Sequence, residues 1–242
     1  MTNTTETSQP FRFKQFSIAQ DQCAMPVNTD GVLLGAWVNV SGTERALDIG
    51  TGTGVIALML AQRLPDAQID AVEIDIDAAA QARANMVASN FSERLHCHTE
   101  SIQNFSRFAE HGYDLIVSNP PFFTGGTLSE NQNRTEVRHT VKLPHGDLIQ
   151  AVRRLLAPTG RLAVILPHIE GLRFIEMATT YGLHLRRQTN LHTRANKPIE
   201  RILVELSKEN GEAVVDELVL YTDGNDRTKT AAYEALVGAF YL

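Results

Sequence analysis

The sequence contains few cysteines and no long apolar runs, and each shortage excludes a class of protein. Cys23 and Cys97 lie far apart and match no Cys-x-x-Cys or zinc-ligand spacing, so we expect two ordinary thiols and neither a disulfide nor a metal site. No apolar run is long enough to span a bilayer, and residues 1–10 lack the apolar centre of a signal peptide. We therefore expect a cytoplasmic protein without a membrane partner, and nothing in the sequence indicates an obligate protein partner.

The formal net charge of the chain is −6 at pH 7, but this charge is unevenly spread. Residues 1–130 have a net charge of −8 and residues 211–242 of −4, whereas residues 131–210 have a net charge of +6. A basic segment in an acidic chain is typical of a nucleic-acid face, but the same charges can also be solvated and scattered over several sides. The sequence leaves both interpretations open. Most of the positive charge is carried by Arg134, Arg138, Lys142, Arg153, Arg154, Arg186, Arg187, Arg194, Lys197 and Arg201.

Short apolar segments alternate with amphipathic ones along most of the chain. This alternation is typical of an α/β fold with a Rossmann-like, doubly wound, mostly parallel sheet and helices on both faces. Towards the end, two successive strands would form a hairpin and place one antiparallel strand in the sheet. We expect strands at residues 46–49, 69–74, 94–98, 113–118, 160–166, 183–191 and 201–206, and helices at residues 55–63, 77–90, 146–156 and 171–181.

A chain of 242 residues, 43% of them hydrophobic, is long enough for one substantial core. No repeat, low-complexity tract or linker divides it. We therefore expect a single domain over residues 1–242. Its expected parts are a disordered start at residues 1–10, an N-terminal extension at 11–40, a catalytic core at 41–210, and a C-terminal strand and helix at 211–242.

The N-terminal extension combines two patterns. Residues 11–18 alternate between apolar and polar side chains as an edge strand would. The apolar run at residues 32–37 predicts a helix, and Thr29 or Asp30 is well placed to cap its N-terminus. Alternatively, the Asp30 carboxylate faces the amino group of a cofactor's amino-acid tail.

Three glycines in close succession follow the first core strand and precede a helix. Gly50, Gly52 and Gly54 let the backbone turn sharply and let a ligand approach without a Cβ in its way. Their spacing differs from the G-x-G-x-x-G of a dinucleotide site, and Asp48 beside them would repel phosphate but suits the cationic amino group of S-adenosyl-L-methionine. Glu73 ends the next strand, near the spacing at which a carboxylate reaches ribose hydroxyls. The alternative for Glu73 is a surface acid at a strand end.

A second motif, Asn119-Pro120-Pro121-Phe122, follows a predicted buried strand. The prolines stiffen the turn, so the Asn119 side-chain oxygen and the Pro120 carbonyl can accept both protons of one exocyclic amino group. This arrangement keeps the lone pair of the acceptor nitrogen from delocalising into its ring and aims it at an electrophilic methyl group. Phe122 can stack on the acceptor base once that base has left the stack of its neighbours in the nucleic acid. The motif predicts methyl transfer to a planar amino group by direct in-line displacement. We also expect Asn119 to lie next to the cofactor.

Together the two motifs resemble those of class I S-adenosylmethionine-dependent methyltransferases that act on amino nitrogens. Four further segments are similar to the bacterial tRNA1(Val) (adenine-37-N6)-methyltransferases. This resemblance runs from about Phe11 to the C-terminus. It implies a seven-stranded Rossmann-like sheet, S-adenosyl-L-methionine as the methyl donor, and an adenine next to the anticodon of one valine tRNA as the acceptor. The four segments are Phe13-Lys14-Gln15-Phe16, Cys23-Ala24-Met25, Thr29-Asp30-Gly31-Val32-Leu33-Leu34-Gly35-Ala36-Trp37 and Ala239-Phe240-Tyr241-Leu242.

Two positions depart from the pattern of such enzymes. Many of them have an aspartate after the third strand that holds the cofactor adenine, whereas here either Glu100 or the Ser101 hydroxyl must take that role. Several adenine-specific relatives have tyrosine where this chain has Phe122, which also resembles the pattern of guanine-N2 ribosomal RNA methyltransferases. A guanine-N2 or protein glutamine-N5 methyltransferase therefore stays an alternative. A third alternative is a non-catalytic RNA-binding module, but the intact Asn119 and Pro120 argue against it.

The polar segment at residues 124–144 is longer than an ordinary strand-to-helix connection. Because it follows the acceptor motif and contains Arg134, Arg138 and Lys142, we predict that it acts as a lid that binds the RNA substrate. Replacing Arg134 and Arg138 with alanine should weaken tRNA binding and reduce its salt dependence. Binding titrations at several salt concentrations that give an unchanged affinity and slope would contradict this prediction.

Overall fold

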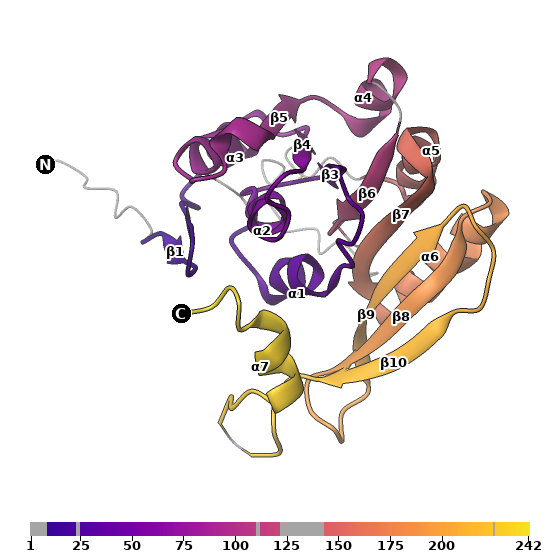
Figure 1. Ribbon diagram of the computed structural model, residues 1–242. Coiled ribbons are helices and arrows are strands. Elements are labelled where there is room, and N and C mark those ends of the chain that lie inside the picture. The colour runs from indigo at the N-terminus through magenta and orange to yellow at the C-terminus, as the bar shows by residue number, and fades with distance from the viewer. Residues whose placement is uncertain (1–8, 23–24, 110–111, 122–142, 225) are drawn as a thin grey trace, which may run out of the picture.

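Figure 1 shows the computed structural model of the chain, which describes residues 9–22, 25–109, 112–121, 143–224 and 226–242. Four of the predicted site residues, Phe122, Arg134, Arg138 and Lys142, lie outside these ranges. So does most of the segment at residues 1–10 that was expected to be disordered.

The described part contains ten strands, seven α-helices and one short 3-10 helix. None of these helices is both long and apolar enough to cross a membrane. The strands are β1 Phe11–Arg12, β2 Ser17–Ile18, β3 Arg45–Ile49, β4 Gln68–Glu73, β5 Leu95–Thr99, β6 Tyr113–Ser118, β7 Leu156–Pro167, β8 His184–His192, β9 Ile199–Ser207 and β10 Val214–Val219. The helices are α1 Thr29–Trp37, α2 Val55–Arg63, α3 Ile76–Val87, η1 Ser92–Arg94, α4 Ile102–Phe108, α5 His145–Leu155, α6 His168–Thr180 and α7 Ala231–Val237.

Eight of the described strands form one sheet, in the order β10-β8-β9-β7-β6-β3-β4-β5. All neighbouring strands are parallel except β9, which is antiparallel to both β7 and β8. The predicted α/β class, with a doubly wound, mostly parallel sheet and one antiparallel strand, is confirmed. The sheet has one strand more than the seven implied by the resemblance. The extra strand is β10, which pairs with β8 and covers an edge whose backbone groups would otherwise be exposed.

Helices cover both faces of the sheet and enclose two hydrophobic clusters (Figure 1). Helices α1, α2, α3 and α7 pack on one face, and α4, α5 and α6 on the other. The central strand β6 shows the alternation clearly, because Leu115 and Val117 belong to the first cluster and Ile116 to the second. In the sequence, a strand that is buried on both faces is a continuous run of apolar residues, and such runs made the sheet predictable.

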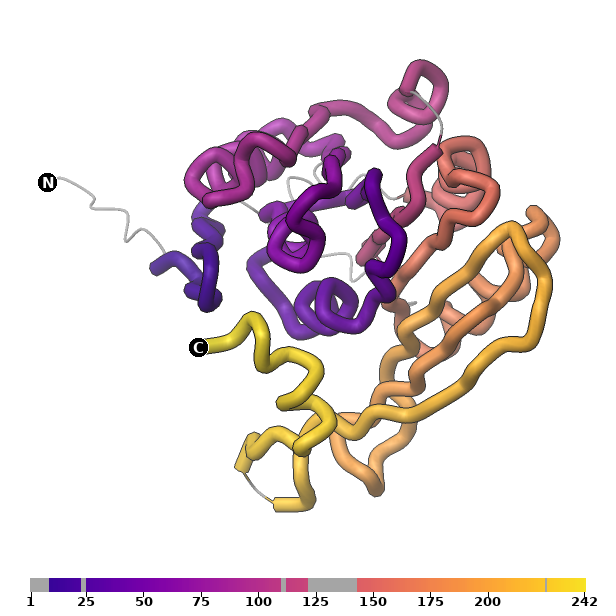
Figure 2. The backbone as a smooth tube through the Cα atoms, viewed as in Figure 1, coloured from indigo at the N-terminus to yellow at the C-terminus, as the bar shows by residue number. Residues whose placement is uncertain are grey.

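The N-terminal extension does not form the edge strand that its alternating pattern predicts. The chain turns between β1 and β2, where the Phe13 amide donates to the Phe16 carbonyl at 2.9 Å, and the resulting hairpin stays outside the main sheet. Aromatic packing explains the difference, because Phe13 is buried and its ring stacks on Tyr241, 5.9 Å away between centroids. Figure 2 shows the first and last described segments side by side.

Helix α1 is capped by Asn28, whose Oδ1 accepts a hydrogen bond from the Gly31 amide at 2.9 Å. The prediction that Thr29 or Asp30 caps this helix is wrong. Both residues already lie in the first turn, and the preceding asparagine is as good a cap as aspartate. The Asp30 side chain is thereby left for another partner.

Candidate active site

The two predicted motifs meet at the carboxyl ends of two neighbouring strands. The glycine turn follows β3, Asn119 follows β6, and the register of this parallel pair places Ile49 opposite Ser118. The Ser118 hydroxyl also donates to the Ile49 carbonyl at 2.9 Å, which fastens the two strand ends together. The strand order reverses between β3 and β6, and ligands of open α/β sheets bind at such a point.

The glycine turn leaves open space in front of the sheet edge. Gly50, Gly52 and Gly54 have φ angles of +72°, +55° and +84°, a region that side chains with a Cβ rarely adopt. A Cβ built on Gly50 would meet no atom within 4 Å, so this glycine is required by the backbone turn and not by crowding within the protein. The turn therefore presents bare backbone to the site.

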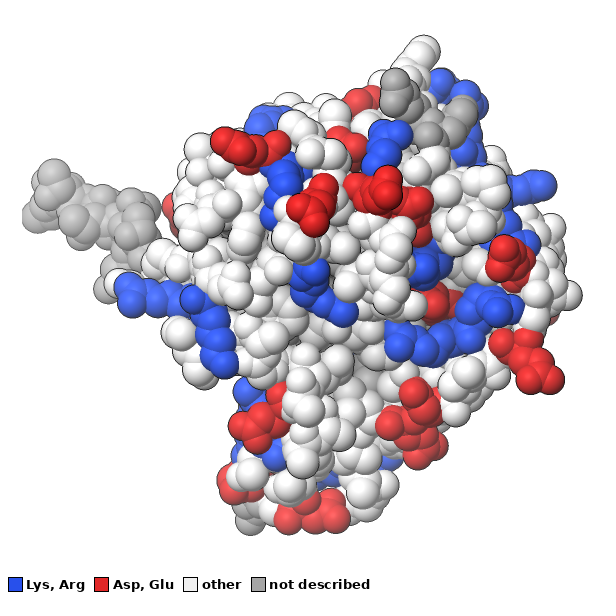
Figure 3. All heavy atoms as spheres, in the orientation of Figure 1, with Lys and Arg blue, Asp and Glu red and all other residues white. Residues whose placement is uncertain are grey.

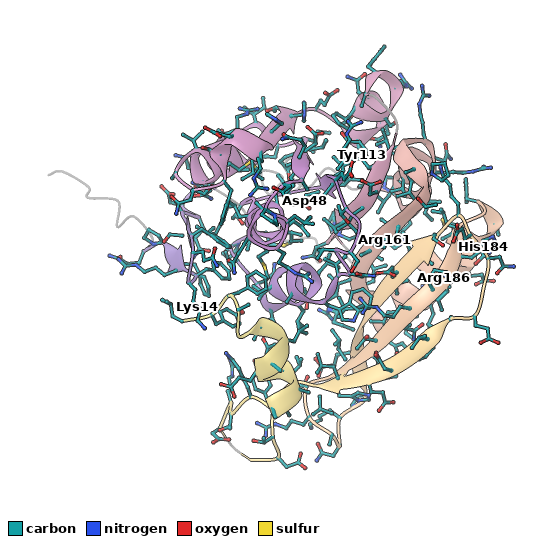
Figure 4. The ribbon with its side chains drawn as sticks, viewed as in Figure 1. Lys14, Asp48, Tyr113, Arg161, His184 and Arg186 are labelled. Atoms are coloured by element: carbon teal, nitrogen blue, oxygen red, sulfur yellow. The ribbon has the colours of Figure 1, made fainter. Side chains whose placement is uncertain are left out.

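Asp48 is the most unusual charged group of the site, because it is fully buried under the start of α2. Its Oδ2 accepts hydrogen bonds from the Thr51 hydroxyl at 2.6 Å and from the Ala57 amide at 3.2 Å, whereas its Oδ1 has no partner within the described part of the chain. Burial raises the pKa of this carboxyl to about 7, against the two hydrogen bonds, which lower it. Figure 4 shows Asp48 at the centre of the molecule. A buried carboxylate oxygen without a donor fits a cationic ligand.

Glu73 lies at the end of β4, and both of its carboxylate oxygens are anchored. Oε2 accepts from the Gly52 amide at 3.0 Å, and Oε1 accepts from the Asp75 amide at 3.0 Å. The half-buried carboxylate thus shapes the glycine turn, a role that its position in the sequence did not indicate. Each oxygen keeps a second lone pair, so the anchored group can still accept hydroxyl donors from a ribose.

Glu100 and Ser101 follow β5 at the same edge, and the structure leaves both alternatives open. The Ser101 hydroxyl caps α4 by accepting from the Asn104 amide at 3.2 Å, and it keeps its own proton for an acceptor. Glu100 accepts from the Asn104 side chain at 2.8 Å, and its amide donates to the Glu73 carbonyl. Glu100 and Ser101 lie one and two residues beyond the end of β5.

Asn119 presents a buried acceptor at the end of β6. Its Oδ1 is shielded from solvent and has no hydrogen-bond partner among the described residues, although the residue as a whole is only half-buried. Pro120 beside it is buried and Pro121 half-buried. A buried acceptor without a donor costs free energy, so its presence next to an open glycine turn indicates a ligand that supplies the missing N–H group.

Asp30 forms an ion pair that the sequence did not reveal. The Arg201 Nε lies 3.0 Å from its Oδ2, and the two side chains are 33% and 20% exposed. Arg201 is the third residue of β9 and is separated from Asp30 by 171 positions, so no local pattern links them. Asp30 lies at the edge of the site, because its neighbour Gly31 is close to Val55, the residue that directly follows the glycine turn. A Cβ built on Gly31 would lie 3.5 Å from Cγ1 of Val55.

Asn85 is a further residue that sequence reasoning missed. Its Nδ2 donates to the Thr53 carbonyl in the glycine turn and to the Ala19 carbonyl, and its Oδ1 accepts from the Ala19 amide, each at 2.9 Å. It therefore joins helix α3, the glycine turn and the N-terminal extension. The available signal was a buried asparagine on the inner face of an amphipathic helix.

The basic residues that the structure describes between positions 143 and 210 do not form one face. Arg187 donates to the Trp37 carbonyl at 2.8 Å and lies 3.7 Å from the centre of its ring, and Arg161 donates to the Asn39 carbonyl at 3.0 Å. These arginines, together with Arg186 labelled in Figure 4, come from β7 and β8. On the face shown in Figure 3, Lys and Arg lie beside Asp and Glu, which is the mixed pattern of solvated charges.

A smaller basic group does lie at the edge of the candidate site. Arg194 and Lys197 belong to the turn between β8 and β9, and Arg201 is the third residue of β9. Because β8 is antiparallel to β9 and β9 to β7, this turn lies at the same edge of the sheet as Asn119. Among the described residues, this basic group has three members, fewer than the ten basic residues that carry most of the positive charge of residues 131–210.

Neither a cysteine nor a metal cluster takes part in the described site. Burial raises the pKa of the Cys97 thiol to about 11, which makes it a poor nucleophile. Within the described ranges, no group of three or more His, Cys, Asp or Glu side chains could hold a metal ion. The candidate chemistry thus rests on carboxylates, one amide and backbone groups.

Comparisons with known proteins identify the family. The family model described as "Methyltransferase small domain" matches residues 31–184. A tRNA1(Val) (adenine(37)-N6)-methyltransferase from Trichodesmium erythraeum is 47% identical over 234 residues, covering 96% of this chain and 97% of the relative. The protein of the same name from Erwinia tasmaniensis is 44% identical over 233 residues, covering 96% and 94%.

Solved structures agree with the fold. A predicted O-methyltransferase from Agrobacterium tumefaciens has a TM-score of 0.71 at 18% identity and covers 87% of this chain and 96% of its own. A putative RNA methyltransferase from Pyrococcus horikoshii has a TM-score of 0.53 at 19% identity, covering 79% and 88%. The resemblance drawn from the motifs is confirmed, and so is S-adenosyl-L-methionine as the cofactor. The chain is an S-adenosyl-L-methionine-dependent methyltransferase and belongs to the tRNA1(Val) (adenine(37)-N6)-methyltransferase family.

Proposed function

We propose that this protein transfers a methyl group from S-adenosyl-L-methionine to N6 of adenine 37 in tRNA1(Val). The names of relatives that are 43–47% identical over 96% of the chain support this substrate. The observation that carries the chemistry is the buried, unpartnered Oδ1 of Asn119 beside the glycine turn. An exocyclic amino group is the donor that this oxygen lacks.

In this proposal Asn119 and Pro120 orient the acceptor nitrogen. The Asn119 Oδ1 and the Pro120 carbonyl oxygen accept hydrogen bonds from its two N–H groups, which keeps the nitrogen lone pair from delocalising into the purine ring. The bound cofactor supplies the methyl group as an electrophile on a sulfonium. Positioning and hydrogen bonding are the main contributions of the protein, and no covalent enzyme intermediate is needed. Phe122, which lies outside the described residues, remains the proposed stacking partner of the base.

The acidic residues of the site fit the remaining parts of the cofactor. Asp48, fully buried with one unpartnered oxygen, is suited to the positively charged end. Glu73, at the end of β4, is proposed to accept the ribose hydroxyls, and Glu100 or Ser101, after β5, to contact the adenine. Asp30 is proposed to face the amino-acid tail while Arg201 holds its carboxylate in place.

Glu73→Ala should weaken S-adenosyl-L-methionine binding by about tenfold or more. The variant loses the proposed ribose acceptor and also the acceptor of the Gly52 amide that holds the glycine turn. Glu93→Ala, which removes an exposed glutamate from η1, is the matched control and should bind normally. Isothermal titration calorimetry measures both, and equal affinities for the two variants would contradict the assignment.

The reaction itself is tested with methyl-labelled S-adenosyl-L-methionine and RNA from cells that lack the modification. Labelled nucleosides are then identified by mass spectrometry in the separated tRNA and ribosomal RNA. We expect N6-methyladenosine in the tRNA fraction. N2-methylguanosine in ribosomal RNA, or label only in protein, would replace the proposal by one of the other acceptors, and no label at all would contradict catalysis.

A further inference from the structure

A second cleft lies where the two ends of the described chain meet. Its volume is about 380 Å³, within the range of a nucleotide-sized ligand site. Its lining residues come from β1, the start of α1, the segment after β10, α7 and the C-terminal residues. Figures 1 and 2 show where these backbone segments lie. The side chains that carry its chemistry are Phe11, Arg12, Tyr221, Lys229, Tyr233 and Tyr241.

This cleft opens at the same edge of the sheet as the candidate active site. Strand β10 is parallel to β8, and Tyr221 follows its carboxyl end by two residues. On the other side the cleft is lined by Thr29, whose neighbour Asp30 belongs to the proposed cofactor site. An RNA strand that delivers a base to Asn119 therefore reaches this cleft along one edge of the molecule.

The cleft combines aromatic rings with free positive charge. Lys229 Nζ lies 4.4 Å from the centre of the Tyr241 ring and 5.9 Å from that of Tyr233, and the rings of Tyr221 and Tyr233 are nearly perpendicular. Arg12 is exposed, and neither Arg12 nor Lys229 pairs with a carboxylate in the described part of the chain. No Asp or Glu side chain lines the cleft, although residues 211–242 have a net charge of −4.

Rings and unpaired cations of this kind recognise single-stranded nucleic acid. Bases stack on aromatic side chains whatever their sequence, and Lys and Arg bind the phosphates between them. An apolar peptide would leave both cations buried without partners, and a double helix is too wide for one such cleft. The chemistry thus favours a single unpaired nucleotide with its phosphate.

We propose that this cleft binds one unpaired nucleotide of the RNA substrate, on the strand that carries the target base. The base stacks against Tyr221 or Tyr241, and the phosphate contacts Arg12 and Lys229. The inference rests on the proposed function, because it assigns a second anchor for the same substrate. It adds residues from both ends of the chain to the RNA-binding surface.

Charge reversal tests the phosphate contact with a matched control on the same loop. Lys229→Glu should raise the KM for tRNA about tenfold, with kcat at saturating tRNA and the Kd for S-adenosyl-L-methionine unchanged. Arg227→Glu changes the net charge equally at an exposed position outside the cleft, and its KM should change less than threefold. The slope of log KM against log salt should decrease only for Lys229→Glu.

A second pair of variants tests stacking independently of charge. Tyr221→Ala should raise the KM for tRNA severalfold, and Tyr221→Phe should restore it, because phenylalanine keeps the ring. Thermal melts confirm that each variant is folded. If wild-type enzyme methylates tRNA and all cleft variants match Arg227→Glu, the cleft proposal is overturned and the proposed function stands. If the wild-type enzyme methylates no tRNA, the proposed function fails and the cleft assignment fails with it.

Discussion

Asn119→Ala should reduce the rate of methyl transfer to tRNA by about 10²–10³-fold, the usual effect of removing one preorganised group that acts on the reacting atoms. The variant loses the buried acceptor that orients the amino group, while Asp48, the glycine turn and Glu73 remain. Binding of S-adenosyl-L-methionine should therefore change little. The decrease should appear in kcat and not in the KM for tRNA, because the contact orients the reacting nitrogen.

A matched asparagine at the opposite end of the sheet controls for the loss of the side chain. Asn39 is exposed, and its Oδ1 accepts only from the nearby Ser41 amide. Asn39→Ala should retain wild-type kcat. Single-turnover rates with saturating cofactor and tRNA measure both variants, and a fully active Asn119→Ala would refute the role assigned to this residue.

Asp48→Asn should have two opposite effects, a more stable cofactor-free protein and weaker cofactor binding. Burial raises the pKa of Asp48 from 3.8 to about 7, so above pH 7 the folded protein contains a carboxylate that would be more stable in water. A neutral amide removes this cost and keeps an acceptor for Thr51 and Ala57. It also removes the proposed partner of the cofactor's positive charge, which should weaken binding by about thirtyfold or more.

The pH dependence follows from the direction of this shift. Between pH 3.8 and about 7 the folded state holds a proton on Asp48 that the unfolded state has lost, so Asp48 lowers stability as pH rises through this range. The Tm of Asp48→Asn should thus exceed that of the wild type at pH 8 and equal it near pH 4. Wild-type affinity for S-adenosyl-L-methionine should fall below pH 7, where binding must expel the proton, and the affinity of the variant should not.

Differential scanning fluorimetry without ligand and calorimetric titration with S-adenosyl-L-methionine measure these two effects. Asp66→Asn, at an exposed position, provides the control for loss of one negative charge. An apo Tm of Asp48→Asn at pH 8 no higher than that of the wild type would contradict the burial argument. Unchanged affinity would contradict the charge pairing.

The central sheet and the meeting of the two motifs at its edge were predictable because burial on both faces leaves a strong local pattern. Strand β6 and helix α2 have the predicted bounds, 113–118 and 55–63. The glycine turn and Asn119 each follow a buried strand, so parallel pairing of β3 and β6 was enough to bring them together.

Features that depend on distant residues were not predictable. The edge strand expected at residues 11–18 became a hairpin because Phe13 stacks on Tyr241 at the other end of the chain. The helix predicted to reach Leu156 ends at Leu155, where β7 begins to pair with β6. Likewise, the ion pair of Asp30 joins residues that are 171 positions apart.

The proposed site accepts an exocyclic amino group, and a substrate that lacks this group provides the decisive test. Two tRNA1(Val) transcripts are prepared that differ only at position 37, one with adenosine and one with inosine, which has an oxo group in place of the amino group. With methyl-labelled S-adenosyl-L-methionine, we expect near-stoichiometric label on the adenosine transcript, recovered as N6-methyladenosine, and none on the inosine transcript. Equal label on both transcripts would contradict the claim.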